Sequence, residues 1–473
     1  MPEFSVGKLS EGTIEKLAYG GKGVLHLENF VVFVQNALPG QLVRFQITHK
    51  KKNYAEAKVI EVLKRSPIEI EPEFEKMPGC PFQTVKYEDQ LKIKESQVFE
   101  TLQHLGGIAP EEYEQLKILP SPEIIRYRNK VEFSFGYEVM RVEVNEYGER
   151  VYFDENPTLG FHPEGKWALV KSMNDCFLVS ENVNSVRKLA EEIMQTSGLP
   201  IWNPKISRGF WRSLILRESK ATGNILMNFI VSEKKSNSFW KEIAEVCIKK
   251  MPKISGVLVT QNGEKGDALR GNPEYEIIWG TDILFEKLEQ TEFMISPFAF
   301  FQTNTRGAEK LFGKARDFAC LSGKETILDL FCGTGAIGLF LAKNVKKIVG
   351  IEFDQNAISD AEKNAKKNGL KSAEYFCGKA EQILPDVLEK YPKFDVVFVD
   401  PPRAGMHPKA MEILKKIPSK KMIFISCNPA TLARDLRELR TAGWKLKKVQ
   451  PVDMFPHTPH IETVALLDAP KSF

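Results

Sequence analysis

The chain has 473 residues, of which 42% are hydrophobic and 27% charged, with a formal net charge of +4. This length predicts two to four domains with sizeable cores, and the small net charge excludes a uniformly basic surface. The seven cysteines contain no Cys-x-x-Cys pair, which disfavours a zinc site and a disulfide framework and predicts a reducing compartment. Because neither a signal sequence nor a bilayer-length apolar run is found, we expect a cytoplasmic protein without a membrane partner.

Residues 5–66 contain short apolar runs separated by turns, which predicts five short strands in a small closed barrel of the oligonucleotide-binding type. A glycine-rich turn at Tyr19–Gly23 is one of these connections. Between Gln41 and Ser66 there are seven Lys or Arg and two Glu. Tyr54 follows the Lys50–Lys52 run, and an aromatic ring beside basic side chains can stack a base.

The same stretch resembles a TRAM domain through the segments Gly20–Gly23, Val32–Gln41 and Lys51–Leu63. TRAM domains bind RNA, so the resemblance implies that this barrel contacts RNA. The residues that we expect to make these contacts are Lys22, Lys50, Lys51, Lys52 and Tyr54.

Residues 67–290 are expected to form a central α+β domain that contacts RNA. A proline-containing linker opens it, and a helical segment at about 87–105, which ends at Gly106-Gly107, is expected to pack on the catalytic domain. The stretch 119–290 then alternates strand-like and helical runs. Its basic patches are Arg126–Lys130 and Arg208–Arg217.

Residues 291–473 predict a Rossmann-like α/β domain with a doubly wound parallel sheet, because apolar strands alternate with helical segments. The predicted strands are 327–330, 348–351, 373–377, 396–399 and 422–425, and the predicted helices are 336–344, 356–368, 409–417 and 431–442. Ligands of such a sheet bind at the carboxyl ends of the strands. A late strand at 464–467 is expected to join antiparallel.

The first of these strands is followed by Gly333-Thr-Gly335-Ala-Ile-Gly338, a G-x-G-x-x-G pattern that also occurs in dinucleotide-binding proteins. Glu352, which ends the second strand, is compatible with the ribose of a nicotinamide cofactor or of S-adenosylmethionine. Asp329, four residues before the first glycine, suits a cationic sulfonium and sits poorly beside a pyrophosphate. We therefore favour S-adenosylmethionine, and a NAD-linked oxidoreductase stays as the remote alternative.

Cys427 ends the apolar run that begins at Met422, and Asn428 with Pro429 are the N-cap and first residue of a helix. A thiol at the end of a strand that faces a helix N-terminus is expected to have a lowered pKa and an increased thiolate fraction. The alternative is a buried cysteine that serves as a small hydrophobe.

The fourth strand ends in Asp400-Pro401-Pro402, a rigid turn that holds a carboxylate over the cleft. Similar turns serve amino-methyltransferases, which need no cysteine, so Cys427 points to methylation of a ring carbon. A thiolate that adds to C6 of a pyrimidine makes C5 nucleophilic, and a base must later remove the C5 proton. Glu462 is the candidate base, and His457 and His460 compete with it.

With these motifs in view, the chain resembles the RNA uracil-C5 methyltransferase family. The resemblance is carried by Phe300–Asn304, Asp329–Gly335, Asp400–Gly405, Ser426–Asp435 and Phe455–Val464, together with Tyr127–Lys130. It implies that Cys427 is the nucleophile, Glu462 the base and Asp400 an acidic group of the active site. The expected contacts to S-adenosylmethionine are Gln302, Asp329, Phe331, Gly333, Gly335, Glu352 and Asp400, and the expected RNA contacts in the central domain are Arg128 and Lys130.

Many TRAM-bearing relatives bind a [4Fe–4S] cluster through Cys-x5-Cys-x2-Cys and a distant fourth cysteine. Here Cys80 and Cys176 match the third and fourth positions, whereas Glu71 and Met77 occupy the first two. Two thiolates cannot hold a cluster that needs four ligands, so we expect none. The expected product is 5-methyluridine in 23S ribosomal RNA, with transfer RNA as the alternative substrate and a monomeric enzyme.

Overall fold

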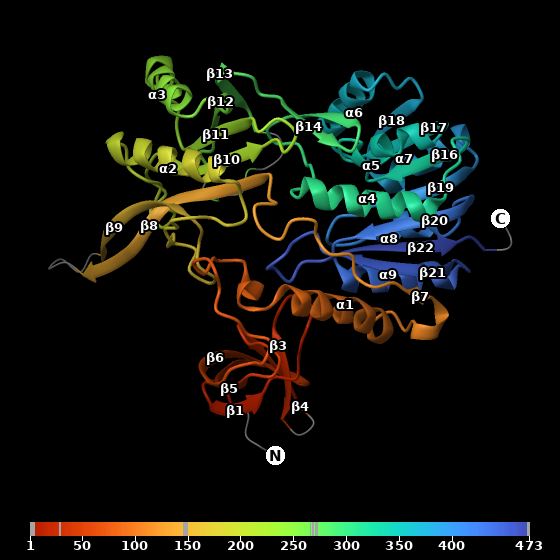
Figure 1. Ribbon diagram of the computed structural model, residues 1–473, viewed down its shortest axis with the longest axis horizontal. Helices are drawn as coiled ribbons and strands as arrows, with labels where there is room; N and C mark the ends of the chain where they lie inside the picture. Colours follow the sequence, from red (N-terminus) through yellow and green to blue (C-terminus); the bar gives the residue numbers. More distant parts are fainter. Residues whose placement is uncertain are drawn as a thin grey trace. The chain divides into compact units, whose positions relative to one another are not determined.

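The computed structural model describes residues 5–27, 30–144, 150–264, 266, 269 and 273–470. The chain folds into two compact units that do not follow chain order. Unit 1 comprises Met1–Ile124, Lys310–Phe331 and Lys379–Phe473, and unit 2 comprises Ile125–Glu309 and Cys332–Gly378. In Figure 1, unit 1 therefore includes the red and orange N-terminal elements and the blue C-terminal ones.

The N-terminal part of unit 1 is a small barrel, drawn in red in Figure 1. Among the described residues it has six strands rather than the predicted five, in the order β1-β5-β6-β4-β3-β2. Their bounds are β1 (Leu9–Thr13), β2 (Lys16–Leu17), β3 (Gly23–Leu27), β4 (Phe30–Gln35), β5 (Leu42–Lys50) and β6 (Tyr54–Lys64). The segment 9–17 closes the barrel because it pairs with β5 through β1 and with β3 through β2.

The barrel core follows from the alternation along its strands. Inward positions such as Val32, Val34, Val43 and Phe45 are fully buried, and their neighbours on the same strands are more exposed. This period-two burial is the pattern expected of strands that face a core on one side only.

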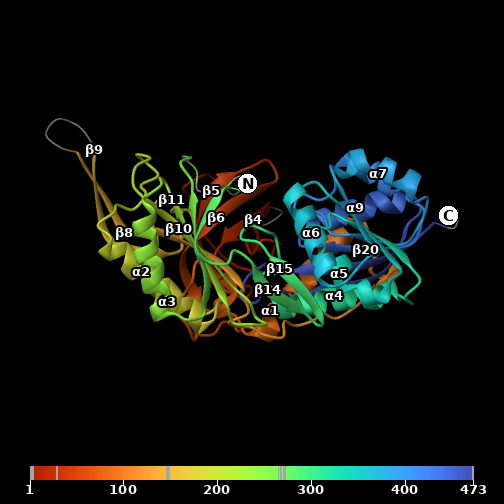
Figure 2. The ribbon, with the colours of Figure 1, turned by 90° about the horizontal axis from the view of Figure 1, so that it is seen from above.

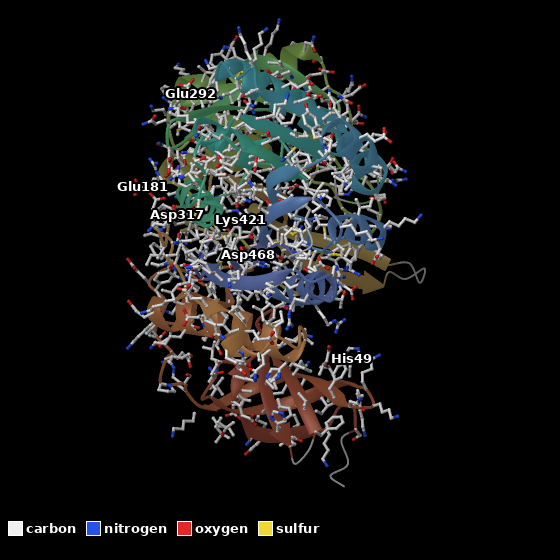
Figure 3. All side chains as sticks on the ribbon, turned by 90° about the vertical axis from the view of Figure 1, so that its right-hand side faces the viewer. His49, Glu181, Glu292, Asp317, Lys421 and Asp468 are labelled. Atoms are coloured by element: carbon white, nitrogen blue, oxygen red, sulfur yellow. The ribbon has the colours of Figure 1, made fainter. Side chains whose placement is uncertain are left out.

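The remainder of unit 1 contains neighbouring strands of a sheet in the order β16-β19-β20-β22-β21-β7. Its strands are β16 (Thr326–Leu330), β19 (Phe394–Val399), β20 (Ser419–Ser426), β22 (Glu462–Asp468), β21 (Lys445–Val452) and β7 (Glu114–Gln115). β16, β19 and β20 are parallel, and β22 pairs antiparallel with β20, which confirms the predicted late strand. Figure 3 labels Lys421 and Asp468, a register pair of β20 and β22.

The helices of this part of unit 1 are α7 (Ala380–Lys390), α8 (Pro408–Leu414) and α9 (Pro429–Thr441). The sequence predicted α8 and α9 but not α7, nor α4 (Thr305–Ala319), nor strand β21. None of the described helices is both long enough and apolar enough to span a bilayer.

Helix α1 (Tyr87–His104), which was predicted at 87–105, connects the barrel to the C-terminal strands of unit 1. Gln97 donates through Nε2 to the main-chain oxygens of Leu17 and Ala18 in the barrel, at 3.3 and 3.0 Å. Lys94 forms an ion pair with Asp453, just after β21, with 2.6 Å between Nζ and Oδ1, and both side chains are fully buried. Because breaking a buried pair leaves an uncompensated charge, this contact fixes α1 against the segment that leads to β22.

Unit 2 is an α+β unit with a sheet in the order β13-β12-β11-β10-β8-β9. Its strands are β8 (Lys130–Val144), β9 (Arg150–Gly160), β10 (Trp211–Glu218), β11 (Ile225–Val231), β12 (Ile254–Gln261) and β13 (Tyr275–Gly280). Helices α2 (Glu181–Thr196) and α3 (Asn237–Lys250) lie side by side along this sheet (Figure 2). Buried aromatic rings, including Trp211 and Trp240 with centroids 5.9 Å apart, fill the core between them.

Unit 2 also contains the hairpin of β14 (Leu284–Leu288) and β15 (Thr291–Ile295) and the parallel pair of β17 (Lys347–Glu352) and β18 (Ala373–Cys377). Helix α6 (Gln355–Lys367) follows β17. Helix α5 (Ala336–Phe340) is shorter than the predicted 336–344, since a 3-10 turn at Ala342–Asn344 completes the segment.

Candidate active site

Four predicted site residues of unit 1 lie at one edge of its sheet. Asp329 is near the carboxyl end of β16, Asp400 follows β19 and Cys427 follows β20. Because these three strands are parallel, their carboxyl ends meet at the same edge. Glu462 is the first residue of the antiparallel strand β22, which therefore begins where the other three end.

Cys427 and Glu462 are brought together by strand register. Ser426 of β20 is paired with Thr463 of β22, so the next positions of the antiparallel ladder are Cys427 and Glu462. Glu462 is 4% exposed, whereas Cys427 is partly accessible. The sequence predicted both residues as site residues, and the register places them opposite one another.

The predicted start of α9 is confirmed. Asn428 is the N-cap, its side chain accepts a hydrogen bond from the Ala430 main-chain N at 3.0 Å, and Pro429 is the first helical residue. The Asn428 Nδ2 also donates to the main-chain oxygen of Arg403 at 3.2 Å, which ties the strand end at Cys427 to the turn after β19.

The expectation that the thiol of Cys427 has a lowered pKa is wrong. Burial, with the nearby carboxyl groups of Glu462 and Asp400, raises the pKa of Cys427 to about 11. The resting protein therefore holds Cys427 as a protonated thiol.

The two carboxyl groups are perturbed in the same sense. Burial and the neighbouring Asp329 raise the pKa of Asp400 to about 7. Burial, followed by the charge of Asp400, raises the pKa of Glu462 well above its ordinary value. Charged forms are disfavoured when acidic groups crowd together away from water, so ionisation is disfavoured at each member of this acidic cluster, defined as Asp400, Cys427 and Glu462.

Arg403 is a functional candidate to which the sequence interpretation gave no role. Its charge lowers the pKa of both Cys427 and Glu462 and partly offsets their burial. Arg403 directly follows Asp400-Pro401-Pro402, so its place in that turn could have identified it as a candidate site residue.

Tyr19 is a second residue whose role was missed. Its Oη donates a hydrogen bond to the main-chain oxygen of Cys427 at 3.0 Å, although the two residues are 408 positions apart in the chain. The sequence placed Tyr19 in a glycine-rich turn of the barrel but carried no signal that this turn reaches the nucleophile candidate.

In unit 2, Glu352 ends β17 with a carboxylate that is held by three main-chain N–H groups. Gly333 donates to Oε2 at 3.1 Å, and Phe353 and Asp354 donate to Oε1 at 2.8 and 3.1 Å. Gly333 and Gly335 have φ values of +54° and +76°, a conformation that favours glycine. The Phe353 side chain is 71% exposed beside this carboxylate, and the sequence interpretation had not singled it out.

Phe331 and Gln302 were also predicted to contact a cofactor. Phe331 has φ +66° directly after β16, which is unusual for a bulky residue and typical of strained functional turns. In unit 2, Gln302 is 8% exposed, and its main-chain oxygen accepts a hydrogen bond from Asn129 Nδ2 at 2.9 Å.

The carboxyl groups at the strand ends of each unit can be compared with the ligand that the sequence predicted. Asp329 and Asp400 of unit 1 are carboxyl groups near a strand end, a chemistry that suits a ligand with positive charge. Glu352 of unit 2 is an anchored acceptor at a strand end, which suits the hydroxyl groups of a ribose. Neither set conflicts with the ligand that the sequence favoured.

The predicted RNA-binding residues of the barrel gather mainly at one hairpin. Lys50 ends β5, Lys51 and Lys52 form the connection, and all three are exposed. Tyr54 begins β6, with its ring edge-on to Phe33 at 5.6 Å. His49, labelled in Figure 3, marks this end of β5. Lys22 lies apart from the connection and forms an ion pair with Glu56 at 3.1 Å.

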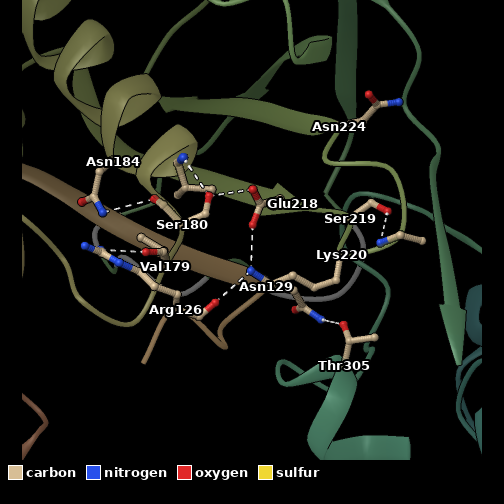
Figure 4. Close-up of polar contacts among 12 residues, drawn as sticks. Arg126, Asn129, Val179, Ser180, Asn184, Glu218, Ser219, Lys220, Asn224 and Thr305 are labelled. Carbon is tan, nitrogen blue, oxygen red and sulfur yellow. Dashed lines mark hydrogen bonds and ion pairs between the residues drawn. The ribbon is translucent and has the colours of Figure 1, made fainter. Parts of the chain in front are cut away.

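The predicted RNA-binding residues of unit 2 lie in a polar region around the start of β8. Arg128 donates through Nε to the main-chain oxygen of Lys130 at 2.8 Å. Burial and the neighbouring Arg217 lower the pKa of Lys130 to about 8. Figure 4 shows the adjoining contacts, in which Asn129 Nδ2 donates to Thr305 Oγ1 at 2.9 Å.

The residues at the expected positions of iron–sulfur ligands have other surroundings. The carboxylate of Glu71 accepts from Arg65 at 2.6 Å, and Met77 is buried. Cys80 and Cys176 are buried and form no disulfide. Within the described ranges, no group of three or more His, Cys, Asp or Glu side chains could hold a metal ion.

Comparisons with known proteins cover both ends of the chain. The tRNA (Uracil-5-)-methyltransferase family matches residues 274–470, and the TRAM domain matches residues 4–60. An uncharacterised RNA methyltransferase of Clostridium tetani is 36% identical over 465 residues, which span 97% of this chain and 97% of that protein. Another, from Chlorobaculum tepidum, is 36% identical over 450 residues, or 93% of this chain and 92% of its own length.

Among solved structures, the chain is similar to the tRNA (uracil-54, C5)-methyltransferase of Pyrococcus abyssi in complex with S-adenosyl-L-homocysteine. The TM-score is 0.75 at 26% identity, and the match covers 97% of this chain and 99% of that one. The predicted fold class, a Rossmann-like α/β domain with an N-terminal barrel and a central α+β part, is confirmed by this similarity.

Proposed function

Because the chain belongs to the TRAM-bearing tRNA (uracil-5-)-methyltransferase family of RNA methyltransferases, we propose that it methylates C5 of uridine in RNA with S-adenosylmethionine. The observation that carries this proposal is the register of β20 and β22, which places Glu462 opposite Cys427 beside Asp400. Addition to C6 requires a nucleophile, and proton removal at C5 requires a base close to the same ring.

Cys427 is the proposed nucleophile. Its thiolate forms a bond to C6 of the uracil ring, and the C5–C6 π electrons move to give an enolate. C5 then attacks the methyl group, which S-adenosylmethionine supplies when it is bound. In the last step Glu462 takes the proton from C5, the electrons of that bond restore the C5–C6 double bond, and the bond from C6 to Sγ of Cys427 breaks.

Because the pKa values of the acidic cluster are raised, the Cys427 thiol must lose its proton before these reaction steps can begin. A thiol with a pKa of about 11 is almost entirely protonated at neutral pH. Positive charge that comes near the cluster favours the anionic forms of the thiol and the carboxyl groups. Arg403 supplies part of this charge, and a sulfonium substrate has the sign needed to supply more.

We propose that the predicted cofactor residues bind S-adenosylmethionine through the groups already described. Asp329, Phe331 and Asp400 belong to unit 1, whereas Gln302, Gly333, Gly335 and Glu352 belong to unit 2. The P. abyssi structure, solved with S-adenosyl-L-homocysteine, supports S-adenosylmethionine over a nicotinamide cofactor.

The first candidate substrate is 23S ribosomal RNA, because the resemblance noted in the sequence is to TRAM-bearing members that act there. The second is transfer RNA, which is favoured by the similarity to the P. abyssi enzyme for uracil 54. Lys22, Lys50, Lys51, Lys52 and Tyr54 of the barrel, with Arg128 and Lys130 of unit 2, are the proposed RNA contacts.

The test is methyl transfer from labelled S-adenosylmethionine to unmodified 23S ribosomal RNA and to unmodified tRNA transcripts, in parallel. Nucleoside mass spectrometry should identify 5-methyluridine in one of the two RNAs, and digestion with mapping should give the position. Cys427→Ala is the negative control. Methylation of a base other than uracil would contradict the proposed reaction. If the enzyme methylates total RNA but neither of these two RNAs, both proposed substrates are wrong.

A further inference from the structure

The glycine-rich turn of the barrel reaches the candidate nucleophile. Tyr19, in the turn between β2 and β3, donates its hydroxyl to the main-chain oxygen of Cys427 at 3.0 Å. Two residues further along, a Cβ added to Gly21 would lie 3.4 Å from Cβ of Pro459. The backbone of the turn thus lies against the segment that leads to Glu462, so the barrel touches both the nucleophile and the approach to the base.

This turn is held in place from several sides. Within it, Ala18 N donates to Lys22 O at 2.9 Å and Gly21 N donates to Ala18 O at 3.0 Å. Gly20 and Gly21 have φ values of +91° and +86°, which residues with a Cβ rarely adopt. From outside, Gln97 of α1 donates to the main-chain oxygen of Ala18. The position of the Tyr19 hydroxyl is therefore set by the fold rather than by a flexible surface loop.

We propose that Tyr19 is a positioning residue for the methylation reaction, through which the RNA-binding barrel holds the main chain at Cys427. The proposal rests on the function proposed above and adds a task for the barrel beyond RNA affinity. A hydroxyl that donates to the Cys427 carbonyl fixes the direction of that peptide group and so the origin of the Cys427 side chain. The positive end of the O–H dipole also lies against the main chain of the residue whose thiol must become negatively charged.

The surroundings of Tyr19 support a donor role. The charged and titratable groups that act on its hydroxyl are Cys427, Arg403 and Glu462. Burial, followed by the charge of Cys427, raises the pKa of Tyr19 to about 12. The phenol therefore stays protonated, and able to donate, throughout the pH range in which the enzyme would work.

The test compares Tyr19→Phe, which keeps the ring and removes the hydroxyl, with Tyr113→Phe. Tyr113 also belongs to unit 1, and its hydroxyl accepts from Gln115 rather than contacting Cys427. Tyr19→Phe should lower kcat about fivefold, the factor that one ordinary hydrogen bond supplies, with KM for RNA unchanged within twofold. Tyr113→Phe should retain the wild-type kcat.

The second measurement needs neither RNA nor a methyl donor. The rate at which iodoacetamide alkylates Cys427, followed by mass spectrometry of its peptide between pH 7.5 and 10, reports thiolate formation. In Tyr19→Phe this rate should fall up to about fivefold at each pH, since one donor aimed at the site is lost. A change that only disturbs packing would instead expose Cys427 and speed its alkylation. Tyr19→Ala, which also removes the ring, serves that comparison.

The proposal is overturned if Tyr19→Phe has the kcat and the alkylation profile of the wild type, or if Tyr113→Phe loses as much activity. Because alkylation is measured on the protein alone, it still tests the contact if the wild type methylates none of the RNAs offered. Failure of the proposed function and failure of the proposed role of Tyr19 are thereby separated.

Discussion

Glu462 stands opposite Cys427, one position beyond the Ser426–Thr463 pair that ends the ladder of β20 and β22. The register of the two strands fixes this relationship through main-chain hydrogen bonds. Each half of the proposed reaction can therefore be removed separately.

Substitution of Cys427 should abolish turnover without preventing RNA binding. Cys427→Ser and Cys427→Ala lack the thiolate that adds to C6, so methylation should fall by several orders of magnitude while RNA affinity stays within twofold. RNA that contains 5-fluorouridine should trap the wild type as a covalent complex, because fluorine at C5 leaves no proton to remove. Cys320→Ala, which changes an exposed cysteine of unit 1, is the control. Robust methylation by Cys427→Ala would refute the assignment.

Glu462→Gln should separate methyl transfer from product release. The amide keeps the size of the side chain but cannot accept the C5 proton, a step that a positioned base accelerates typically 10²–10⁴-fold. The variant should methylate RNA once and accumulate as an adduct at Cys427, visible as a shifted band under denaturing conditions.

The controls for that experiment are His457→Ala and His460→Ala, which should release product. His457 is held by α1, since its main-chain N donates to Gln90 Oε1 at 2.8 Å, and burial lowers its pKa. If a histidine variant accumulates the adduct while Glu462→Gln turns over normally, that histidine is the base.

Asp400→Asn should stabilise the protein at alkaline pH. The pKa of Asp400 is about 7 in the folded protein and 3.8 in the unfolded chain. Between these values the unfolded chain releases a proton that the folded protein keeps, so stability falls as pH rises from about 4 to 7. Removing the group should raise the free energy of unfolding at pH 8 by at most about 4 kcal/mol, and the gain should disappear toward pH 4.

Thermal or urea unfolding at pH 4.5 and pH 8 checks this, with Asp395→Asn as the control. Asp395 lies near the other end of β19, where it accepts from Thr326 N at 3.0 Å and pairs with Lys420 at 3.1 Å. Its replacement should lower stability at pH 8. An equal decrease in the free energy of unfolding of both variants at pH 8 would show that the folded protein does not raise the pKa of Asp400.

Replacement of Lys50, Lys51 and Lys52 by Gln should weaken RNA binding and flatten its dependence on salt. Each lost phosphate contact lowers the slope of log K against log salt concentration by about 0.7–0.9. kcat at saturating RNA should be unchanged. Replacement of three lysines of α6, Lys363, Lys366 and Lys367, is the matched control and should leave the slope as it is. An unchanged slope in the barrel variant would show that this hairpin does not contact phosphates.

Protein purified without oxygen should be colourless and contain no stoichiometric iron. Glu71 and Met77 stand where relatives with a cluster have cysteines, and a [4Fe–4S] cluster needs four ligands. Iron analysis and the absorbance spectrum check this. A brown preparation with about four irons per chain would show that other side chains complete the site.

The features that the sequence predicted well depend on local rules. Met422–Pro429 predicts the end of a strand followed by the capped N-terminus of a helix. The antiparallel late strand is predicted from its position after the last strand–helix crossover. Helix α7 was missed because Pro385 lies inside it and proline normally argues against a helix interior. Helix α4 was missed although its buried residues Ala308, Leu311, Phe312 and Ala315 recur at helical spacing.

Features that depend on distant contacts could not be predicted. The pKa of Cys427 was expected to be low from its neighbours in the chain, whereas burial and two carboxyl groups from other strands decide it. The same holds for Tyr19, since a turn of the barrel gives no local sign of which strand end it will touch.

The fully buried pair of Lys94 and Asp453 has a consequence for biosynthesis. The two residues are 359 positions apart, and unit 1 contains both the first and the last segment of the chain. During translation Lys94 leaves the ribosome long before its partner has been made, so α1 cannot settle into its final position until Asp453 has been synthesised. A chain that stops short of Asp453 would have to bury an unpaired ammonium group, which is strongly unfavourable. An incomplete chain would therefore keep the contacts of α1 with the barrel but lack the buried pair that holds α1 against the C-terminal strands.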